Sequence, residues 1–211
     1  FFMQKTAYEI PLRLVGSEMC IRDRYRLTAH LGMAVFIYSL ILWTVFDLSL
    51  NYNHAIRSRI KWMSSTLTLL IFLMILSGGL VAGTRAGIPF PTWPLMGDTF
   101  IPPQIYSMNP SWLSAFEDMA TIQFNHRMFA YLLTILIVIF AIVLLRSNVP
   151  RFLKNGTTAL LFVLSLQVAL GISTLLFYIP IPVAAAHQVG AIALLSVSLF
   201  ITHSCLSREQ I

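Results

Sequence analysis

Charged residues are scarce in this sequence. Asp, Glu, Lys and Arg make up 10% of the 211 residues, whereas about one quarter of the residues in a soluble domain are charged. Hydrophobic residues reach 57%, and the mean hydropathy is +0.79. Water is therefore not the main solvent of this chain. The first partner that we expect is the lipid bilayer, and we expect no nucleic-acid partner.

Cysteine is almost absent as well. The two cysteines are Cys20, near the N-terminus, and Cys205, near the inner end of the last apolar stretch. These positions offer no useful pairing, so we expect no disulfide between them. The sequence also shows no thiol metal site.

Long apolar stretches are what the sequence does contain. A helix needs about 20 mainly apolar residues to cross a bilayer, and charged residues avoid the interiors of such stretches because unpaired polar groups are costly in hydrocarbon. The fold class that we predict is all-α, a polytopic membrane protein. Its five transmembrane helices are predicted at residues 27–46, 62–83, 120–145, 157–179 and 183–203.

The basic residues of the short loops predict the orientation. Cytoplasmic loops are enriched in Lys and Arg, and basic residues cluster in the predicted loops at 47–61 and 146–156. We therefore place these loops inside, in the cytoplasm or the mitochondrial matrix. The long loop 84–119 and the uncharged turn Pro180-Ile181-Pro182 then lie outside.

The N-terminal segment contradicts this orientation. With five spans the N-terminus lies outside, yet residues 1–26 contain five basic side chains. We interpret residues 1–24 as a non-native or disordered leader, because its run AYEIPLRLVGSEMCIRDR looks like translated adaptor sequence. Removing it takes four of the five basic residues from the outer side. The alternative is a genuine short outer tail.

Three histidines occupy matching positions in the predicted spans. His30, His126 and His187 each follow shortly after the outer start of a span, which at 1.5 Å per residue places each imidazole roughly 6 to 10 Å below the outer boundary. An ionisable residue in a membrane helix is a functional candidate by default. The alternative is a histidine that is hydrogen-bonded across the bundle, and we keep that interpretation for His54 and His203.

Small residues accompany two of these histidines. Ala29-His30 is followed by Gly32 and Ala34, and Ala186-His187 by Gly190 and Ala191, a weak sign of internal duplication. Small residues allow close approach to a helix backbone. Haem is a flat, bulky ligand for which neutral imidazole is the commonest axial donor.

Five motifs in order resemble the haem A synthase family. Gln123-Phe124-Asn125-His126-Arg127, continuing through Ala130-Tyr131, is similar to the signature that opens the family's sixth helix. The other motifs are GGLVAGTRAG at 78–87, FPTWPLMGDTFIPP at 90–103, Gln167-Val168-Ala169-Leu170-Gly171-Ile172, and Ala186-His187-Gln188. The resemblance covers essentially residues 25–211.

The resemblance implies an eight-helix protein made of two four-helix halves, each with a haem site between two histidines. The implied enzyme is an oxidoreductase that oxidises the C8 methyl of haem O to the formyl group of haem A for cytochrome oxidase assembly. Residues 25–46 then correspond to the last helix of an N-terminally truncated first half, 47–61 to an inner loop, and 62–211 to the haem-binding C-terminal half.

The resemblance also implies the site residues. His126 and His187 match the axial ligands of the iron in a haem b that passes electrons, and His30 matches a ligand on the side of the substrate haem O. The partner of His30 would lie in the missing segment, so we expect this chain to bind haem without being a competent synthase by itself.

Three polar residues near the outer boundary have two interpretations each. Arg127 is placed to meet a haem propionate, for which guanidinium offers two donors, or to face lipid headgroups. Glu117 and Asp118 either assist proton movement or order the outer loop, or they are simply solvated. Loop 84–119, stiffened by proline and aromatic residues, either folds over the outer mouth of the haem site or lies at the membrane interface.

Two other functions compete with the family interpretation. One is a cytochrome b-like electron carrier that acts on quinol, and the other is a transporter or assembly scaffold whose histidines bind no haem. For a synthase we expect haem O synthase and an electron donor as partners, and a homo-oligomer stays open. The expected location is a bacterial cytoplasmic membrane or the mitochondrial inner membrane.

Overall fold

The computed structural model describes the backbone of residues 9–50 and 55–206, and side chains from residue 23 onward within these ranges. Each of its five long helices contains a segment long and apolar enough to cross a membrane. The helices are α1 (Glu9–Ser49), α2 (Ser58–Thr84), α4 (Met119–Leu145), α5 (Arg151–Leu176) and α6 (Ile181–Leu206), and the loop after α2 holds η1 (Ser111–Leu113) and α3 (Ser114–Glu117). The predicted all-α membrane fold with five spans is confirmed.

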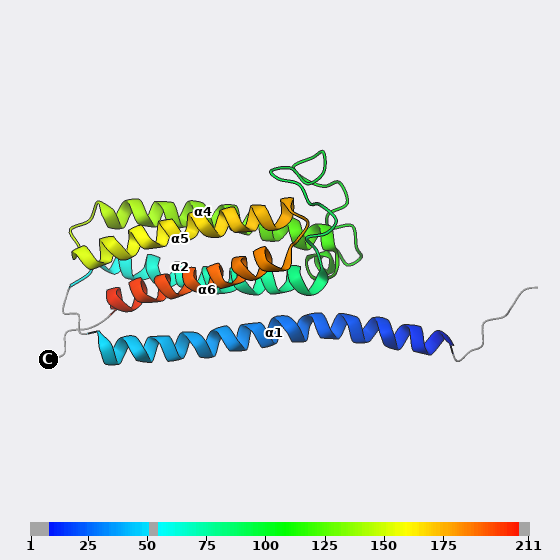
Figure 1. Ribbon diagram of the computed structural model, residues 1–211, viewed down its shortest axis with the longest axis horizontal. Coiled ribbons are helices and arrows are strands. Elements are labelled where there is room, and N and C mark those ends of the chain that lie inside the picture. Colours follow the sequence, from blue (N-terminus) through cyan, green and yellow to red (C-terminus); the bar gives the residue numbers. More distant parts are fainter. Residues whose placement is uncertain (1–8, 51–54, 207–211) are drawn as a thin grey trace, which may run out of the picture.

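The last four long helices form a closed bundle. α2 packs against α4, α4 against α5, α5 against α6, and α6 back against α2. α4 and α6 are therefore diagonal partners, as are α2 and α5. α1 packs outside this ring, mainly against α2 and α6, and its N-terminal part extends beyond the bundle (Figure 1).

Apolar side chains separate into an inner and an outer set. Ile71, Ile137 and Leu195 are almost fully buried in the bundle interior, where the four helices supply one continuous apolar core. Large apolar side chains such as Ile135 and Phe162 remain exposed on the bundle surface. Such a surface would be costly in water, and it suits contact with lipid chains.

The connections between helices alternate between the two ends of the bundle. Loop 85–118 and the α5–α6 turn lie at one end, whereas the α1–α2 and α4–α5 connections lie at the other (Figure 1). The end with the α4–α5 connection carries the basic residues of loop 146–150 and the start of α5. This arrangement agrees with the orientation predicted from loop charge.

The observed bounds of α5 differ from the prediction at both ends. The helix starts six residues earlier than the predicted Thr157, directly after Pro150, whose φ is −55°. Proline is well tolerated at helix starts, where no backbone donor is required. The helix ends earlier than predicted because Tyr178 and Ile179 adopt positive φ values of 58° and 59°, which cannot continue a right-handed helix.

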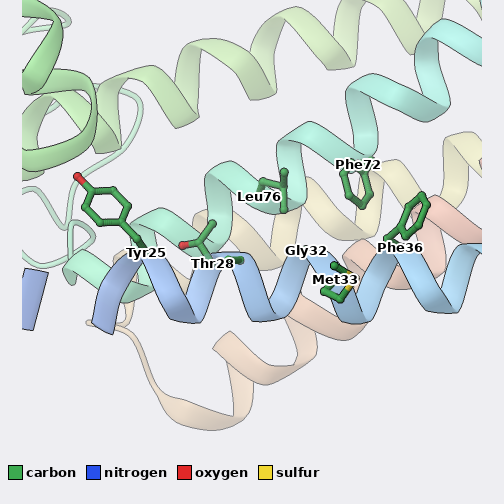
Figure 2. Close-up of a pocket in the computed structure, with 8 residues that line it drawn as sticks. Tyr25, Thr28, Gly32, Met33, Phe36, Phe72 and Leu76 are labelled. Carbon is green, nitrogen blue, oxygen red and sulfur yellow. The ribbon is translucent and has the colours of Figure 1, made fainter. Parts of the chain in front are cut away.

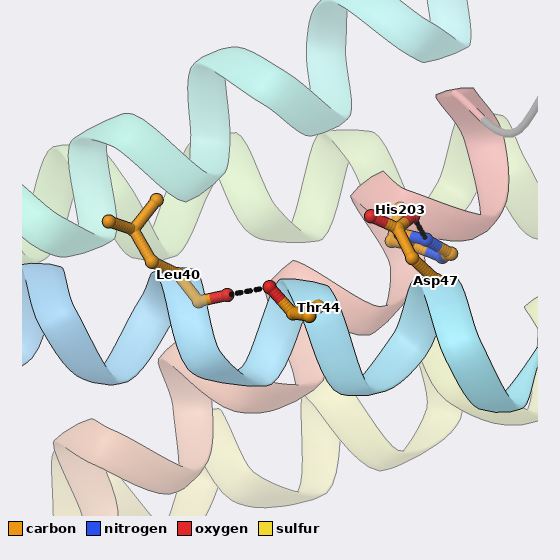
Figure 3. A network of polar contacts seen from close by, with 4 residues as sticks. All are labelled: Leu40, Thr44, Asp47 and His203. Carbon is orange, nitrogen blue, oxygen red and sulfur yellow. Dashed lines mark hydrogen bonds and ion pairs between the residues drawn. The ribbon is translucent and has the colours of Figure 1, made fainter.

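Polar contacts tie α1 and α2 to α6. His203 Nε2 lies 2.7 Å from Asp47 Oδ1 at the inner end, where α1 and α6 meet (Figure 3). Thr68 Oγ1 on α2 lies 2.7 Å from Ser198 Oγ and 2.8 Å from Thr202 Oγ1 on α6. Hydrogen bonds of this kind hold helices together within a bilayer.

The predicted leader at residues 1–24 lies only partly in the described region. Helix α1 includes Glu9 onward, and the side chains before residue 23 lie outside the description. The foreign origin of this segment stays a prediction. His54, in the predicted inner loop, lies outside the described residues.

Candidate functional site

His126 lies two turns into α4. The helix begins at Met119, and its N-cap Asp118 accepts a hydrogen bond from the backbone N–H of Thr121. The imidazole Nδ1 lies 3.0 Å from Ser77 Oγ on α2. The next residue, Gly78, faces the same ring, since a Cβ built there would lie 3.5 Å from His126 Cε1. Ser77 and Gly78 thus form a seat for this ring on α2.

His187 lies in the second turn of α6 and has a corresponding seat on α5. Its Nδ1 lies 3.2 Å from the backbone carbonyl oxygen of Gln167. One turn further along α5, a Cβ at Gly171 would lie only 2.9 Å from His187 Cε1. Gly190 in turn leaves room on α6 for the side chain of Gln167. Glycine at these positions permits the close approach of α5 and α6.

The two imidazoles belong to α4 and α6, which are diagonal helices of the bundle. In each ring Nδ1 has a hydrogen-bond partner, and within the described residues no hydrogen bond involves either Nε2. Among those residues, no group of three or more His, Cys, Asp and Glu side chains could hold a bare metal ion. A haem supplies four ligands itself and needs two axial donors. The donor set therefore fits a haem.

His30 is not brought together with this pair. It is exposed on α1, outside the four-helix ring. It does lie near the same level of the bundle, because its neighbours Thr28 and Leu31 face Gly79, next to the Gly78 that faces His126.

Arg127 binds the outer loop. Its guanidinium is 6% exposed, and it donates to the carbonyl oxygens of Leu95 at 3.1 Å, Phe90 at 3.0 Å and Thr92 at 2.7 Å. Gln123, one turn earlier, also donates to Phe90 O, at 3.0 Å. These two side chains fasten segment 90–95 to the outer end of α4, beside His126. Arg127 Nε and Gln123 Oε1 are buried and have no hydrogen-bond partner among the described residues.

Glu117 and Asp118 have separate structural contacts. Glu117 Oε1 accepts a hydrogen bond of 2.7 Å from the Tyr25 hydroxyl, which links the outer loop to α1. Asp118 caps α4 by accepting from Thr121 N at 2.8 Å and from the Thr121 hydroxyl at 2.5 Å. Side-chain acceptors at this position satisfy the free backbone donors of a helix start.

An apolar groove of about 440 Å³ lies between α1 and α2, away from the histidine pair (Figure 2). Its lining includes Gly32, Met33, Phe36, Phe72 and Leu76, and neither His126 nor His187 belongs to it. The groove offers little polar surface, and the chemistry-bearing residues lie elsewhere.

The sequence did not reveal the partners of the site histidines. Ser77 directly precedes the glycine-rich motif at 78–87, and Gln167 opens the motif at 167–172. Both residues therefore lie in or beside a motif that the sequence analysis singled out. Their contacts with the histidines could not be predicted, because each contact joins two helices. The carbonyl partners of Arg127 gave no signal, because backbone acceptors have no sequence signature.

Fold and site together define a multi-pass membrane protein whose four-helix bundle carries two histidines on diagonal helices, suited to axial ligation of haem. The family model of the COX15-CtaA cytochrome oxidase assembly proteins matches residues 14–199. The chain belongs to this family.

Three relatives show how the similarity is distributed. The haem A synthase of Nitrosospira multiformis is 42% identical over 186 residues, which cover 86% of this chain and 52% of the relative. That of Paracoccus denitrificans is 39% identical, covering 90% and 51%. Haem A synthase COX15 of Bos taurus is 37% identical, covering 85% and 44%. The chain spans about half the length of these relatives.

Proposed function

We propose that this chain binds one haem b between His126 and His187. The observation that carries the proposal is the geometry of the two rings, which come from diagonal helices and have Nδ1 engaged and Nε2 without a hydrogen bond. When bound, such a haem supplies one-electron transfer, for which two axial imidazoles that leave no open position are well suited.

The reaction that we propose for the whole protein is the oxidation of the C8 methyl of haem O to the formyl group of haem A. Support comes from the family membership and from relatives that are haem A synthases. The role of the present half is to hold the electron-transferring haem. Haem O is the substrate, haem O synthase and an electron donor are the expected partners, and a homo-oligomer stays open.

The other polar residues have distinct proposed roles. Arg127 has one unpartnered donor, Nε–H, beside His126, and this donor is the proposed contact to a haem propionate. Because its other nitrogens hold the 90–95 segment, Arg127 would couple the loop to the occupied site. His30, exposed on α1, is the proposed ligand of the substrate-side haem, with its partner in the other half. Glu117 is proposed to assist proton movement together with Tyr25.

The haem site is tested by titrating the purified chain with haem and counting bound haem optically. We expect one low-spin haem per chain, and we expect His126→Ala and His187→Ala each to abolish the low-spin spectrum. His54→Ala, in the predicted inner loop, serves as the control and should bind haem normally. A chain without a Soret band, or a His126→Ala variant with normal low-spin haem, would contradict the proposal.

The reaction is tested separately with the uninterrupted protein. Conversion of haem O to haem A by that protein, and its loss in His126→Ala, would support the proposed reaction. Bound haem without conversion would favour a cytochrome b-like electron carrier instead.

A further inference from the structure

The hydrogen bond of Ser77 differs from the common hydrogen bond of a serine within a helix. A serine within a helix commonly donates to the carbonyl four residues earlier, as Ser39, Ser65, Ser165 and Ser196 do. The hydroxyl of Ser77 instead reaches from α2 to α4, where its Oγ lies 3.0 Å from His126 Nδ1. The hydroxyl is thus directed at the imidazole.

The tautomer of each imidazole decides whether it can bind a metal. A neutral imidazole carries its proton on one nitrogen and a lone pair on the other. The carbonyl oxygen of Gln167 can only accept, so the Nδ1 of His187 must carry the proton in that contact. His126 faces a hydroxyl, which can donate or accept. Its Nε2 is free to bind iron only if the hydroxyl accepts.

We propose that Ser77 is the positioning residue for His126. It accepts a hydrogen bond from Nδ1–H, selects the tautomer with the lone pair on Nε2, and holds the plane of the ring above Gly78. A partner of this kind fixes the orientation of a ligating histidine and raises its basicity. This inference rests on the proposed function, in which His126 is an axial ligand.

The two seats are not equivalent in this respect. At His187 the acceptor is a backbone carbonyl that no side-chain substitution removes, whereas at His126 it is a side chain. Ser77→Ala, which removes one oxygen atom, therefore tests the contact of His126 and leaves the contact of His187 intact. Ser65→Ala on the same helix is the matched control, because the Ser65 hydroxyl bonds within its own helix to Lys61 O.

The first experiment uses the haem-free chain and measures histidine tautomers by ¹⁵N NMR, with His126 assigned through its loss in His126→Asn. We expect the Nδ1–H tautomer in the wild type, in Ser65→Ala and in Ser77→Thr, which retains the hydroxyl. Ser77→Ala should shift His126 toward the Nε2–H tautomer. An Nε2–H tautomer in the wild type, or no shift in Ser77→Ala, would overturn the inference.

The second experiment titrates the same variants with haem and measures the midpoint potential. Loss of an outer partner typically weakens metal affinity about 10- to 100-fold, so we expect such a loss and a higher potential in Ser77→Ala, with restoration in Ser77→Thr. Unchanged affinity and potential in Ser77→Ala would overturn the inference. A wild-type chain that shows the expected tautomer but binds no haem would instead refute the proposed function and support the positioning role.

Discussion

Gly171 lies directly beneath the imidazole of His187. A Cβ at this position would lie 2.9 Å from His187 Cε1, a separation at which the ring or the helix must shift. We predict that Gly171→Ala displaces the ring and sharply reduces the fraction of low-spin haem, measured optically at saturating haem.

Gly78 provides the matched control for Gly171. A Cβ there would lie 3.5 Å from His126 Cε1, which is ordinary van der Waals contact, and alanine is favoured over glycine within helices by about 1 kcal/mol. Gly78→Ala should therefore keep its low-spin haem. Equal fractions of low-spin haem in Gly171→Ala and Gly78→Ala would show that the imidazoles do not pack against these glycines as described.

Arg127 is predicted to order the outer loop. Its guanidinium donates to three carbonyl oxygens between Phe90 and Leu95, and hydrogen bonds to charged groups contribute about 1.5 to 3 kcal/mol. Arg127→Ala should accelerate amide hydrogen exchange in segment 90–97 about 10- to 100-fold. Exchange measured by mass spectrometry checks this, with Arg146→Ala, exposed at the other end of α4, as the control. Unchanged exchange in Arg127→Ala would remove the proposed role of Arg127 in the loop.

At the residue scale, the sequence singled out the candidate ligands but not the residues that contact them. His126 and His187 stand out because ionisable side chains are rare within apolar spans. Ser77, the Gln167 carbonyl and the contact of His203 with Asp47 could not be predicted, since each joins residues on different helices. His203, interpreted from sequence as a histidine that is hydrogen-bonded across the bundle, does link α6 to α1, although its partner Asp47 was not predicted.

At the scale of helices, Thr68 is the main polar contact between α2 and α6. Its hydroxyl lies within hydrogen-bond distance of both Ser198 and Thr202. Interhelical hydrogen bonds in membranes average about 0.6 kcal/mol and reach about 1.7 kcal/mol, so Thr68→Val should lower the free energy of unfolding by about 1 kcal/mol. Unfolding in mixed micelles measures this difference.

Thr66 supplies the comparison for Thr68. It is exposed on the same helix, and Thr66→Val replaces the same group with the same side chain. We expect no loss of stability in this variant. A loss equal to that of Thr68→Val would mean that the hydroxyl contacts to α6 contribute nothing specific.

The spans could be predicted from hydropathy, whereas their ends depend on local geometry. α4 begins one residue from the predicted start, because the apolar stretch and the capping Asp118 coincide there. α5 was misplaced because Arg151 and Lys154 were assigned to the loop. Basic residues can occupy the first turns of a helix that extends beyond the hydrocarbon, and Pro150 marks the true start.

At the scale of the molecule, the structure separates one helix from a closed ring of four. α1 contacts α2 and α6 but carries His30 at an exposed position, while His126 and His187 lie on helices of the ring. Hydropathy alone could not have predicted the ring, because it locates the membrane-spanning helices but does not show which helices pack against one another.

The central claim is that His126 and His187 together ligate one haem, and electron paramagnetic resonance of the ferric, haem-loaded chain tests it most directly. We predict a low-spin signal of the bis-imidazole type in the wild type, and its replacement by a high-spin signal or its loss in both His126→Ala and His187→Ala. A low-spin signal that survives unchanged in either variant would contradict the account.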